Sequence, residues 1–428
     1  MIVYRAPFHS PKVSVDTVMH RTRSLICVAL CLAASSVMAD LTIGGSGESC
    51  SEDPACINRI HPGIPMAARA RPGERIVMIG RDAGDMEIDP DAFASGSGSP
   101  RLSFGVVHPL TGPVYIETAK AGDVLAVTIE RIDPGPVGWT SASAFGFAGA
   151  AVGSEDRFIV WRLDDDFATS EDLPGVRIPN ASFPGVITTM PGNEQLLDVL
   201  DREQHLADAG GAVFEPDPDS AQPSSLCGTE GTHAAECLRT IPPREFGGNM
   251  DIRYMGEGVT VYLPCFIDGC GLAIGDFHYA QGDGEVSGTA IEMDADITVT
   301  TTVIKDGRTL GHGPHSSGPS SLLSIPSSTF YATTGFPLKN AGEIPPDIAA
   351  LATAKVSELR NLSKDVNLAA QNALVSMIDY IVAEYGYDRT QAYMIASVAV
   401  DIRIGQLVDV PNVGATAILP LDIFVNRD

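Results

Sequence analysis

The chain has 428 residues, 44% of them hydrophobic and 19% charged, and its 54 acidic and 28 basic residues give a net charge of −26. The hydrophobic share can fill a core, which argues against a disordered chain, and 43 Gly and 30 Pro argue against a coiled coil. Because phosphate contacts need clustered Lys and Arg, the acidic balance argues against binding nucleic acid through a basic surface.

The first 39 residues have the features of an export signal. Met19–Ala39 starts with the basic residues Arg21 and Arg23, continues with a short apolar run over 25–34 and ends in the small-residue segment Val37–Ala39. This order is typical of a signal peptide and its cleavage site, preceded here by an upstream extension or a misplaced start codon. The alternative is an uncleaved N-terminal anchor.

No later run of about 18 apolar residues was found, so no membrane span is expected. The protein is therefore predicted to be exported, either periplasmic or secreted.

Removal of residues 1–39 leaves six cysteines in three close pairs, which are Cys50 with Cys56, Cys227 with Cys237, and Cys265 with Cys270. An even count in an exported chain indicates disulfides, although six cysteines allow fifteen pairings. Sequential pairing is predicted for the first two pairs, while the pairing of the third is left open. Residues 40–56 are expected to form a Cys-containing segment ahead of a main domain over 57–428.

Strand patterns dominate from residue 57 to residue 304. Val124–Ile129 is a buried apolar run, and Ile297–Val303 alternates with a period of two. Polar segments over 92–101 and 203–243 are predicted as loops. A Gly-containing turn followed by a β-branched run occurs three times, at 71–77, 120–125 and 255–261. These repeats indicate hairpins of a sandwich or barrel.

The C-terminal part changes to a helical period. Apolar residues recur at helical spacing over Val366–Glu384, with Asp365 as the expected N-cap and Gly386 as the stop. Asp388 and Gln391 match a capping box.

The capping box is expected to open a second helix over 389–400, followed by strand-like residues near 415–425. The fold is therefore predicted to be mainly β, with sandwich or barrel-like units and a smaller C-terminal α/β part whose helices lie at about 347–400.

The densest group of site-type residues is Gly275–Glu285, which reads GDFHYAQGDGE. Side chains two apart on a strand lie on the same side, so Asp276 and His278 could act together as ligands of a divalent metal. The turn over 282–285 would bring Asp283 and Glu285 beside them, and one crowded acid could serve as a general base. The alternative is a surface hairpin with acidic turn residues.

The run Gly275–Glu292 closely resembles the signature of the acetamidase/formamidase family. Further segments resemble that family in the same order along the chain, over roughly 57–424. They are His108–Ile116 (HPLTGPVYI), Phe183–Ile187 (FPGVI), Pro242–Asp251 (PPREFGGNMD) and Ala396–Asn412.

This resemblance implies an amidase that hydrolyses small aliphatic amides, such as formamide and acetamide, to the acid and ammonia. It also implies a mainly β fold, a divalent metal and a homo-oligomer. Carried over by motif, the site residues fall into three groups. The metal ligands are Asp276, His278 and Asp251; the catalytic residues are Glu285 as general base and Asp283 as a ligand or orienter; and Asn249, Gln281 and His108 hold the substrate or the reacting water.

Two departures from the family pattern stand out. Ser287 occupies a position where the family usually has Cys, so a mechanism with an obligatory cysteine nucleophile would impair this protein or require serine. Attack by metal-activated water is favoured because it needs no such residue. Pro264–Gly271 contains a cysteine pair where the family is usually apolar, which leaves the substrate open.

The sequence thus predicts an exported metal-dependent amidase with a small neutral amide as its substrate. Zinc is the favoured metal, with calcium and manganese as alternatives. A non-catalytic exported binding protein on the same scaffold, and an amidase acting on a larger amide or a cyclic ureide, are the competing interpretations.

Overall fold

The computed structural model describes residues 40–89, 91, 93, 102–144, 146–306, 313–345, 348–349, 354–408 and 411–425. The predicted signal peptide and upstream extension lie outside these residues, as does most of the predicted loop over 92–101. The proposed domain boundaries stay predictions.

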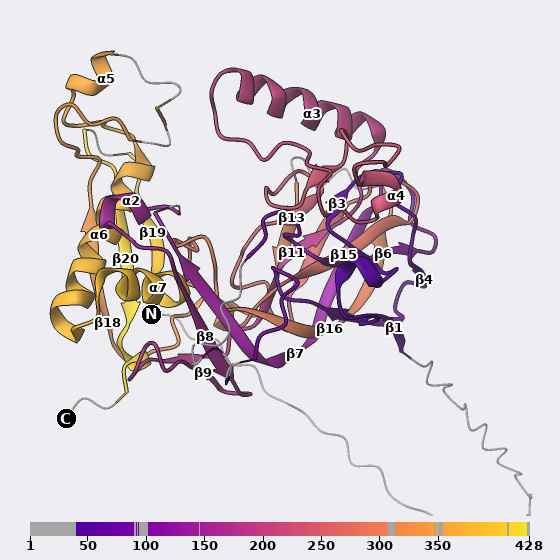
Figure 1. Cartoon of the computed structure of the whole chain (residues 1–428), viewed down its shortest axis with the longest axis horizontal. Helices are drawn as coiled ribbons and strands as arrows, with labels where there is room; N and C mark the ends of the chain where they lie inside the picture. The colour runs from indigo at the N-terminus through magenta and orange to yellow at the C-terminus, as the bar shows by residue number, and fades with distance from the viewer. Residues whose placement is uncertain are drawn as a thin grey trace, which may run out of the picture. The chain divides into compact units, whose positions relative to one another are not determined.

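Two long strands, β7 (Val124–Ala142) and β16 (Glu292–Ile304), pair antiparallel at the centre of a 15-stranded sheet (Figure 1). The path through this sheet runs β10-β9-β8-β7-β16-β15-β11-β13. The remaining strands of the path are β8 (Arg157–Leu163), β9 (Phe167–Thr169), β10 (Arg177–Pro179), β11 (Phe183–Thr188), β13 (Gly247–Asn249) and β15 (Cys270–His278). The mainly β prediction is therefore confirmed.

Shorter strands extend this sheet beside the main path. They are β1 (Leu41–Gly44), β2 (Cys56–Ile57), β4 (Ala68–Ala70), β5 (Arg75–Gly80), β6 (Leu110–Ile116), β14 (Thr260–Pro264) and β17 (His315–Ser317). A separate two-stranded sheet pairs β3 (Arg59–Ile60) with β12 (Leu238–Arg239).

The three predicted turn-and-strand repeats lead into β5, β7 and β14. Their turn glycines, Gly73, Gly122 and Gly258, have φ values of +82°, +90° and +82°, a region that glycine enters without steric cost. Two of the three strands, β5 and β7, pair with β16, and β14 pairs with β7. The repeats therefore build neighbouring strands of one sheet.

The C-terminal part contains a three-stranded antiparallel sheet, in the order β18-β20-β19, and three helices within the described residues. Its strands are β18 (Phe330–Gly335), β19 (Asp401–Gln406) and β20 (Gly414–Pro420), and its helices are α5 (Ala354–Glu358), α6 (Val366–Tyr385) and α7 (Arg389–Ala399). The predicted strand near 415–425 ends at residue 420, where η4 (Leu421–Ile423) begins.

Both predicted helix starts are confirmed. The Asp365 carboxylate accepts a hydrogen bond from the Leu368 N–H at 2.9 Å, and Asp388 with Gln391 forms a complete capping box. Gly386 ends α6 in the left-handed conformation.

Within the described ranges, one helix, α6, is long and apolar enough to cross a membrane, with a mean hydropathy of 1.2. Eight of its residues are buried, and it packs against β18, β20 and α7. Its apolar character is that of a core helix.

The predicted loop over 203–243 is only partly irregular. Helix α3 (Asn193–Asp208) extends into it, and a single turn, α4 (Ser224–Cys227), follows. Leu196 and Val199 are the buried residues of α3, and most of its other side chains are polar or charged. This narrow apolar stripe is the reason that the helix was missed.

Three disulfides brace the described chain. The predicted pairs Cys50–Cys56 and Cys227–Cys237 have S–S distances of 2.07 and 2.04 Å. The third, Cys265–Cys270, joins the end of β14 to the start of β15. Short turns complete the elements, at η1 (Cys50–Glu52), α2 (Gly149–Val152) and η2 (Ser320–Leu323).

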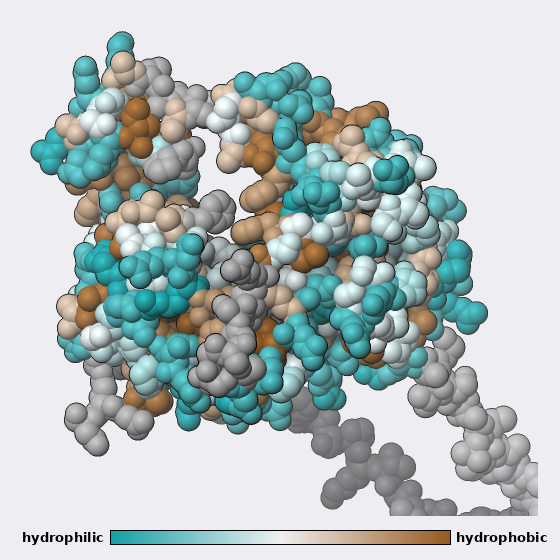
Figure 2. Space-filling view, viewed as in Figure 1, coloured by the Kyte–Doolittle hydropathy of each residue, from teal (hydrophilic) through white to brown (hydrophobic). Residues whose placement is uncertain are grey.

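The face shown in Figure 2 is largely hydrophilic, with apolar patches between the polar areas. A solvated polar surface of this kind is expected for a chain with net charge −26.

Candidate active site

Strands β15 and β16 place an imidazole directly beside a carboxylate. His278 and Glu292 are register partners in the antiparallel pair, and His278 Nε2 lies 3.1 Å from Glu292 Oε2. The Asp276 Oδ2 atom lies 3.5 Å from the same nitrogen. Asp276 and His278 therefore face the same point, as their spacing on the strand predicts.

Two further carboxylates reach this point from loops. Asp251 follows β13, and its ligand atom lies within 4.8 Å of those of Asp276 and His278. Glu285 comes from the turn after β15, and its Oε1 atom is 4.0 Å from His278 Nε2. The site is thus assembled from two consecutive strands, the turn between them and the loop after β13.

The backbone at Gly185 on β11 allows these carboxylates to converge. A Cβ atom at that position would lie 2.6 Å from Asp276 Oδ2 and 2.7 Å from Asp251 Oδ1. Only glycine fits this close approach, which accounts for its place in the segment Phe183–Ile187.

Gln281 fixes the proton on the imidazole. Its Nε2 atom donates to the Asp251 carbonyl at 2.8 Å, so its Oε1 atom accepts from His278 Nδ1 at 2.9 Å. In the neutral ring, the proton on Nδ1 leaves the Nε2 lone pair facing the carboxylates. Gln281, predicted to hold the substrate or the reacting water, uses both polar atoms of its amide here, on the His278 imidazole and on the Asp251 main chain.

Burial controls the protonation of the acidic groups. It raises the pKa of Asp251 to about 8 and raises the pKa values of Glu285 and Glu292. Burial also acts to raise the pKa of Asp276, but nearby His108 and His278 outweigh it and lower that pKa to about 2.

Burial disfavours a charge on both imidazoles, with different results. It lowers the pKa of His108, whereas Glu292 and Asp276 outweigh it at His278 and raise that pKa well above its ordinary value. The uncompensated carboxylates of the cluster must therefore hold protons unless a cation balances them.

The arrangement fits a divalent cation. Among the residues that the structure describes, five buried side-chain polar atoms of this site lack a hydrogen-bond partner. They are His108 Nδ1, Asn249 Oδ1, Asp251 Oδ1, His278 Nε2 and Glu292 Oε2. Buried polar atoms are normally paired, so a shared ligand would satisfy several of them at once. One nitrogen and several oxygens suit zinc, and also manganese or calcium.

A cavity of about 200 Å³ opens beside the cluster. Its lining includes His108, Asn249, Asp276, Glu285 and Glu292. His108 Nε2 lies 3.8 Å from Asp276 Oδ2, and the unpartnered amide oxygen of Asn249 is also in the lining. Both residues are therefore placed where a bound molecule would meet the carboxylates.

Asp283 lies apart from this group. Its Oδ2 atom is 4.0 Å from Arg403 Nε, and its N–H donates to Asp401 Oδ1 at 3.2 Å. Arg253 and Arg403 both pair with Asp401, at 3.3 and 2.9 Å. The acid two residues before Glu285 thus belongs to a second polar cluster.

Glu292 was assigned no role from the sequence, although it closes the run GDFHYAQGDGEVSGTAIE. It is 2% exposed, and its Oε1 atom accepts from the Ala290 N–H at 2.8 Å. Its place at the end of that run, shortly before the strand predicted over Ile297–Val303, was the available signal. Its position opposite His278 depends on the pairing of β15 and β16.

Ser287 is buried, and its hydroxyl donates to the Ser141 carbonyl at 2.8 Å. It does not line the cavity, whereas its neighbours Gly288 and Thr289 do. Within the described residues, the hydrogen-bond partners of this hydroxyl are main-chain carbonyls, which cannot activate it as a nucleophile.

We expect Ser287→Ala to keep amide turnover within about threefold of the parent and to lower the free energy of unfolding by about 1 kcal/mol, through the lost hydrogen bond. Steady-state kinetics and chemical unfolding measure the two effects. Loss of turnover in a folded Ser287→Ala protein would instead point to a nucleophilic serine.

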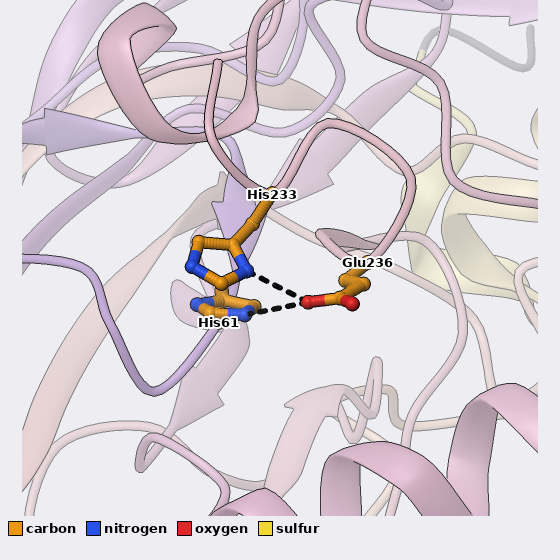
Figure 3. Close-up of side chains that lie close together, drawn as sticks. All are labelled: His61, His233 and Glu236. Atoms are coloured by element: carbon orange, nitrogen blue, oxygen red, sulfur yellow. Dashed lines mark hydrogen bonds and ion pairs between the residues drawn. The ribbon is translucent and has the colours of Figure 1, made fainter.

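A second group of potential ligands is His61, His233 and Glu236, shown in Figure 3. His233 Nδ1 and His61 Nε2 lie 2.7 and 3.7 Å from Glu236 Oε2. The Gly63 N–H donates to His61 Nδ1 at 2.9 Å, which leaves the proton of the neutral ring on Nε2. The Nε2 atom of His61 therefore carries a proton, whereas the Nε2 atom of the neutral His278 ring has a free lone pair. The His61, His233 and Glu236 group is thus better suited to stabilising the loop that carries His233 than to binding a metal.

Over residues 45–426, the chain matches the model of the acetamidase/formamidase family. It is 30% identical over 393 residues to a formamidase of Methylophilus methylotrophus, covering 86% of this chain and 89% of that protein. It is also 30% identical over 370 residues to an acetamidase of Mycolicibacterium smegmatis, covering 79% and 84%. Among solved structures, a gamma lactamase from Delftia acidovorans superposes with a TM-score of 0.77 at 27% identity, covering 90% of this chain and 95% of that one.

Proposed function

The chain belongs to the acetamidase/formamidase family, and from this membership we propose that it is an exported, metal-dependent amidase that hydrolyses short amides to a carboxylic acid and ammonia. The observation that supports the proposal most directly is the convergence of four carboxylates and His278 on one point beside a cavity.

In this proposal Asp251, Asp276, His278 and Glu292 would hold the cation. A bound divalent cation would polarise the amide carbonyl and lower the pKa of a water molecule towards about 7. Gln281 keeps the His278 lone pair directed into the cluster, and Gly185 leaves the space in which the carboxylates approach one another.

Glu285 is the proposed general base. Its pKa is raised by burial and by the charges of Asp251 and Glu292, which makes it a stronger base than an exposed glutamate. It takes a proton from the water as the new C–O bond forms. It then gives that proton to the nitrogen as the C–N bond breaks, and ammonia leaves.

Asn249 and His108 are proposed to hold the amide. The Asn249 Oδ1 atom can accept from the substrate N–H, and burial keeps the His108 ring neutral and able to hydrogen-bond. These roles use buried polar atoms that have no partner within the described part of the chain.

A second candidate activity is hydrolysis of a cyclic amide. The superposition on the gamma lactamase favours it, since that protein matches 90% of this chain. The same residues would open a lactam ring instead of releasing ammonia, so the product distinguishes the two activities.

Export is supported by the three disulfides, which form in oxidising compartments. Together with the signal-like segment Met19–Ala39, they favour a periplasmic or secreted protein. The homo-oligomer stays a prediction.

The function is tested by ammonia release from formamide, acetamide and propionamide, and by ring opening of a γ-lactam, with and without chelator. Turnover that chelator removes and added zinc, manganese or calcium restores supports a metal-dependent amidase. A folded, metal-loaded protein that hydrolyses none of these compounds would contradict the proposal and favour a binding protein.

A further inference from the structure

The cavity is larger than a formamide-sized substrate needs. Its volume is about 200 Å³, and one water molecule takes about 30 Å³ of the liquid, so about six groups of that size fit. Formamide and acetamide would leave much of this space to water. An apolar group that displaces weakly held water from an apolar wall gains binding free energy.

Beyond the polar site residues, the cavity wall is mainly apolar and largely aromatic. Phe104, Phe214 and Trp139 line it together with Leu102 and Ile241. Phe104 and Phe214 are 57% and 37% exposed, whereas Trp139 is 1% exposed. The two phenylalanines therefore present open ring surface, and Trp139 is the buried member of the wall.

Two buried arginines hold both phenylalanine segments. Arg59 Nη2 donates to the carbonyls of Gly105 at 3.0 Å, Asp217 at 2.7 Å and Asp219 at 3.1 Å. Arg239 donates to the Phe104 carbonyl and lies 3.5 Å from the Asp217 carboxylate. The Arg59 guanidinium thus joins the main chain at Gly105, next to Phe104, to the main chain at Asp217, three residues after Phe214.

These arginines are register partners in the β3–β12 sheet. Arg59 is fully buried, and burial together with the charge of Arg239 lowers its pKa to about 10, so it stays charged at neutral pH. A buried guanidinium is tolerated only when its N–H groups are paired. Since main-chain carbonyls supply that pairing, the main chain beside both phenylalanines is held in place by the fold itself.

We propose that the cavity binds a neutral amide with an apolar acyl group of about ring size, which packs against Phe104, Phe214 and Trp139 while its amide reaches the carboxylate cluster. This inference rests on the proposed function and names its substrate class. An anionic acyl group is disfavoured, because the wall offers it no hydrogen bond and the acidic cluster repels it.

Phenylacetamide, acetamide and succinamate are the test substrates. The parent protein should hydrolyse phenylacetamide with the highest kcat/KM and succinamate with the lowest. In Phe104→Ala and Phe214→Ala, kcat/KM for phenylacetamide should fall about tenfold or more, mainly through KM, since a lost apolar contact is worth roughly 10–200-fold. Acetamide hydrolysis should change less than about threefold.

Phe330→Ala is the matched control, because Phe330 is 63% exposed on β18 and does not line the cavity. A parent protein that prefers acetamide, or phenylalanine variants that lose both activities equally, would overturn the inference. If no amide is hydrolysed, the proposed function fails. Calorimetry then still tests what the cavity binds. If phenylacetamide does not bind, or binds no more tightly than acetamide, the inference is overturned.

Discussion

Replacement of Glu285 by Gln is expected to lower kcat by roughly 10²–10⁴-fold, the usual contribution of a positioned acid or base. The amide side chain keeps the shape and the burial of Glu285 but cannot accept the proton of the attacking water. Metal content should be retained, because Asp251, Asp276, His278 and Glu292 stay in place. Steady-state kinetics and metal analysis of the same preparation measure both quantities.

Two other variants test whether the loss of kcat is specific to Glu285. Glu230→Gln changes an exposed acid in the same way and should leave kcat unchanged. Asp283→Asn tests the acid that the sequence placed beside Glu285 and the structure places beside Arg403. A loss in Asp283→Asn as large as that in Glu285→Gln would show that the turn rearranges when substrate binds. A Glu285→Gln protein with parental kcat would eliminate the general-base role.

Chelation of the metal is expected to abolish turnover and to leave a protein whose stability falls between about pH 4 and pH 8. Burial raises the folded-state pKa of Asp251 to about 8 and also raises those of Glu285 and Glu292. A carboxyl group whose pKa is higher in the folded than in the unfolded state stabilises the fold below its ordinary pKa near 4. This stabilisation is lost as the pH rises through the folded-state pKa. The raised pKa of His278 acts in the same direction above about pH 6.5.

The lowered pKa values of Asp276 and His108 act oppositely. That of Asp276 does so only below its ordinary value of 3.8, outside this window, whereas that of His108 does so below about pH 6.5, inside it, against three raised carboxyl pKa values. Thermal unfolding at pH 5 and pH 8, with and without chelator, measures the effect. The metal-loaded protein should lose less stability over this interval, because the cation replaces the protons that the carboxylates otherwise need.

Glu292→Gln should weaken metal binding and reduce the pH dependence, whereas Glu236→Gln in the His61 group should change neither. A chelated protein that is active, or that becomes more stable from pH 5 to pH 8, would refute the metal centre.

The sequence predicted the parts of the fold whose signals are local. The caps at Asp365 and Asp388 and the repeated turns at Gly73, Gly122 and Gly258 each depend on a few adjacent residues, and the structure contains all of them. Helix α3 was missed because its buried face is too narrow to dominate a largely charged segment. These local signals therefore predicted that an element exists more reliably than they predicted where it begins and ends.

The same distinction applies to the site. The two-residue spacing of Asp276 and His278 was enough to predict that they share a face. The role of Glu292 needed the register between β15 and β16, and the orientation of Asp283 needed Arg403 from more than a hundred residues later. No periodic pattern in the sequence marks the residues of the cavity wall, whose main chain is held by Arg59 and Arg239.

The turn that carries Glu285 depends on the last part of the chain. Its Gly282 N–H donates to the Ser397 carbonyl at 2.9 Å, and its Asp283 carbonyl accepts from the Ile402 N–H at 3.0 Å. In a nascent polypeptide these two hydrogen bonds form only after residue 402 has emerged and docked. A protein truncated before α7 would therefore keep its ligand residues but lack the contacts that hold the turn carrying Glu285.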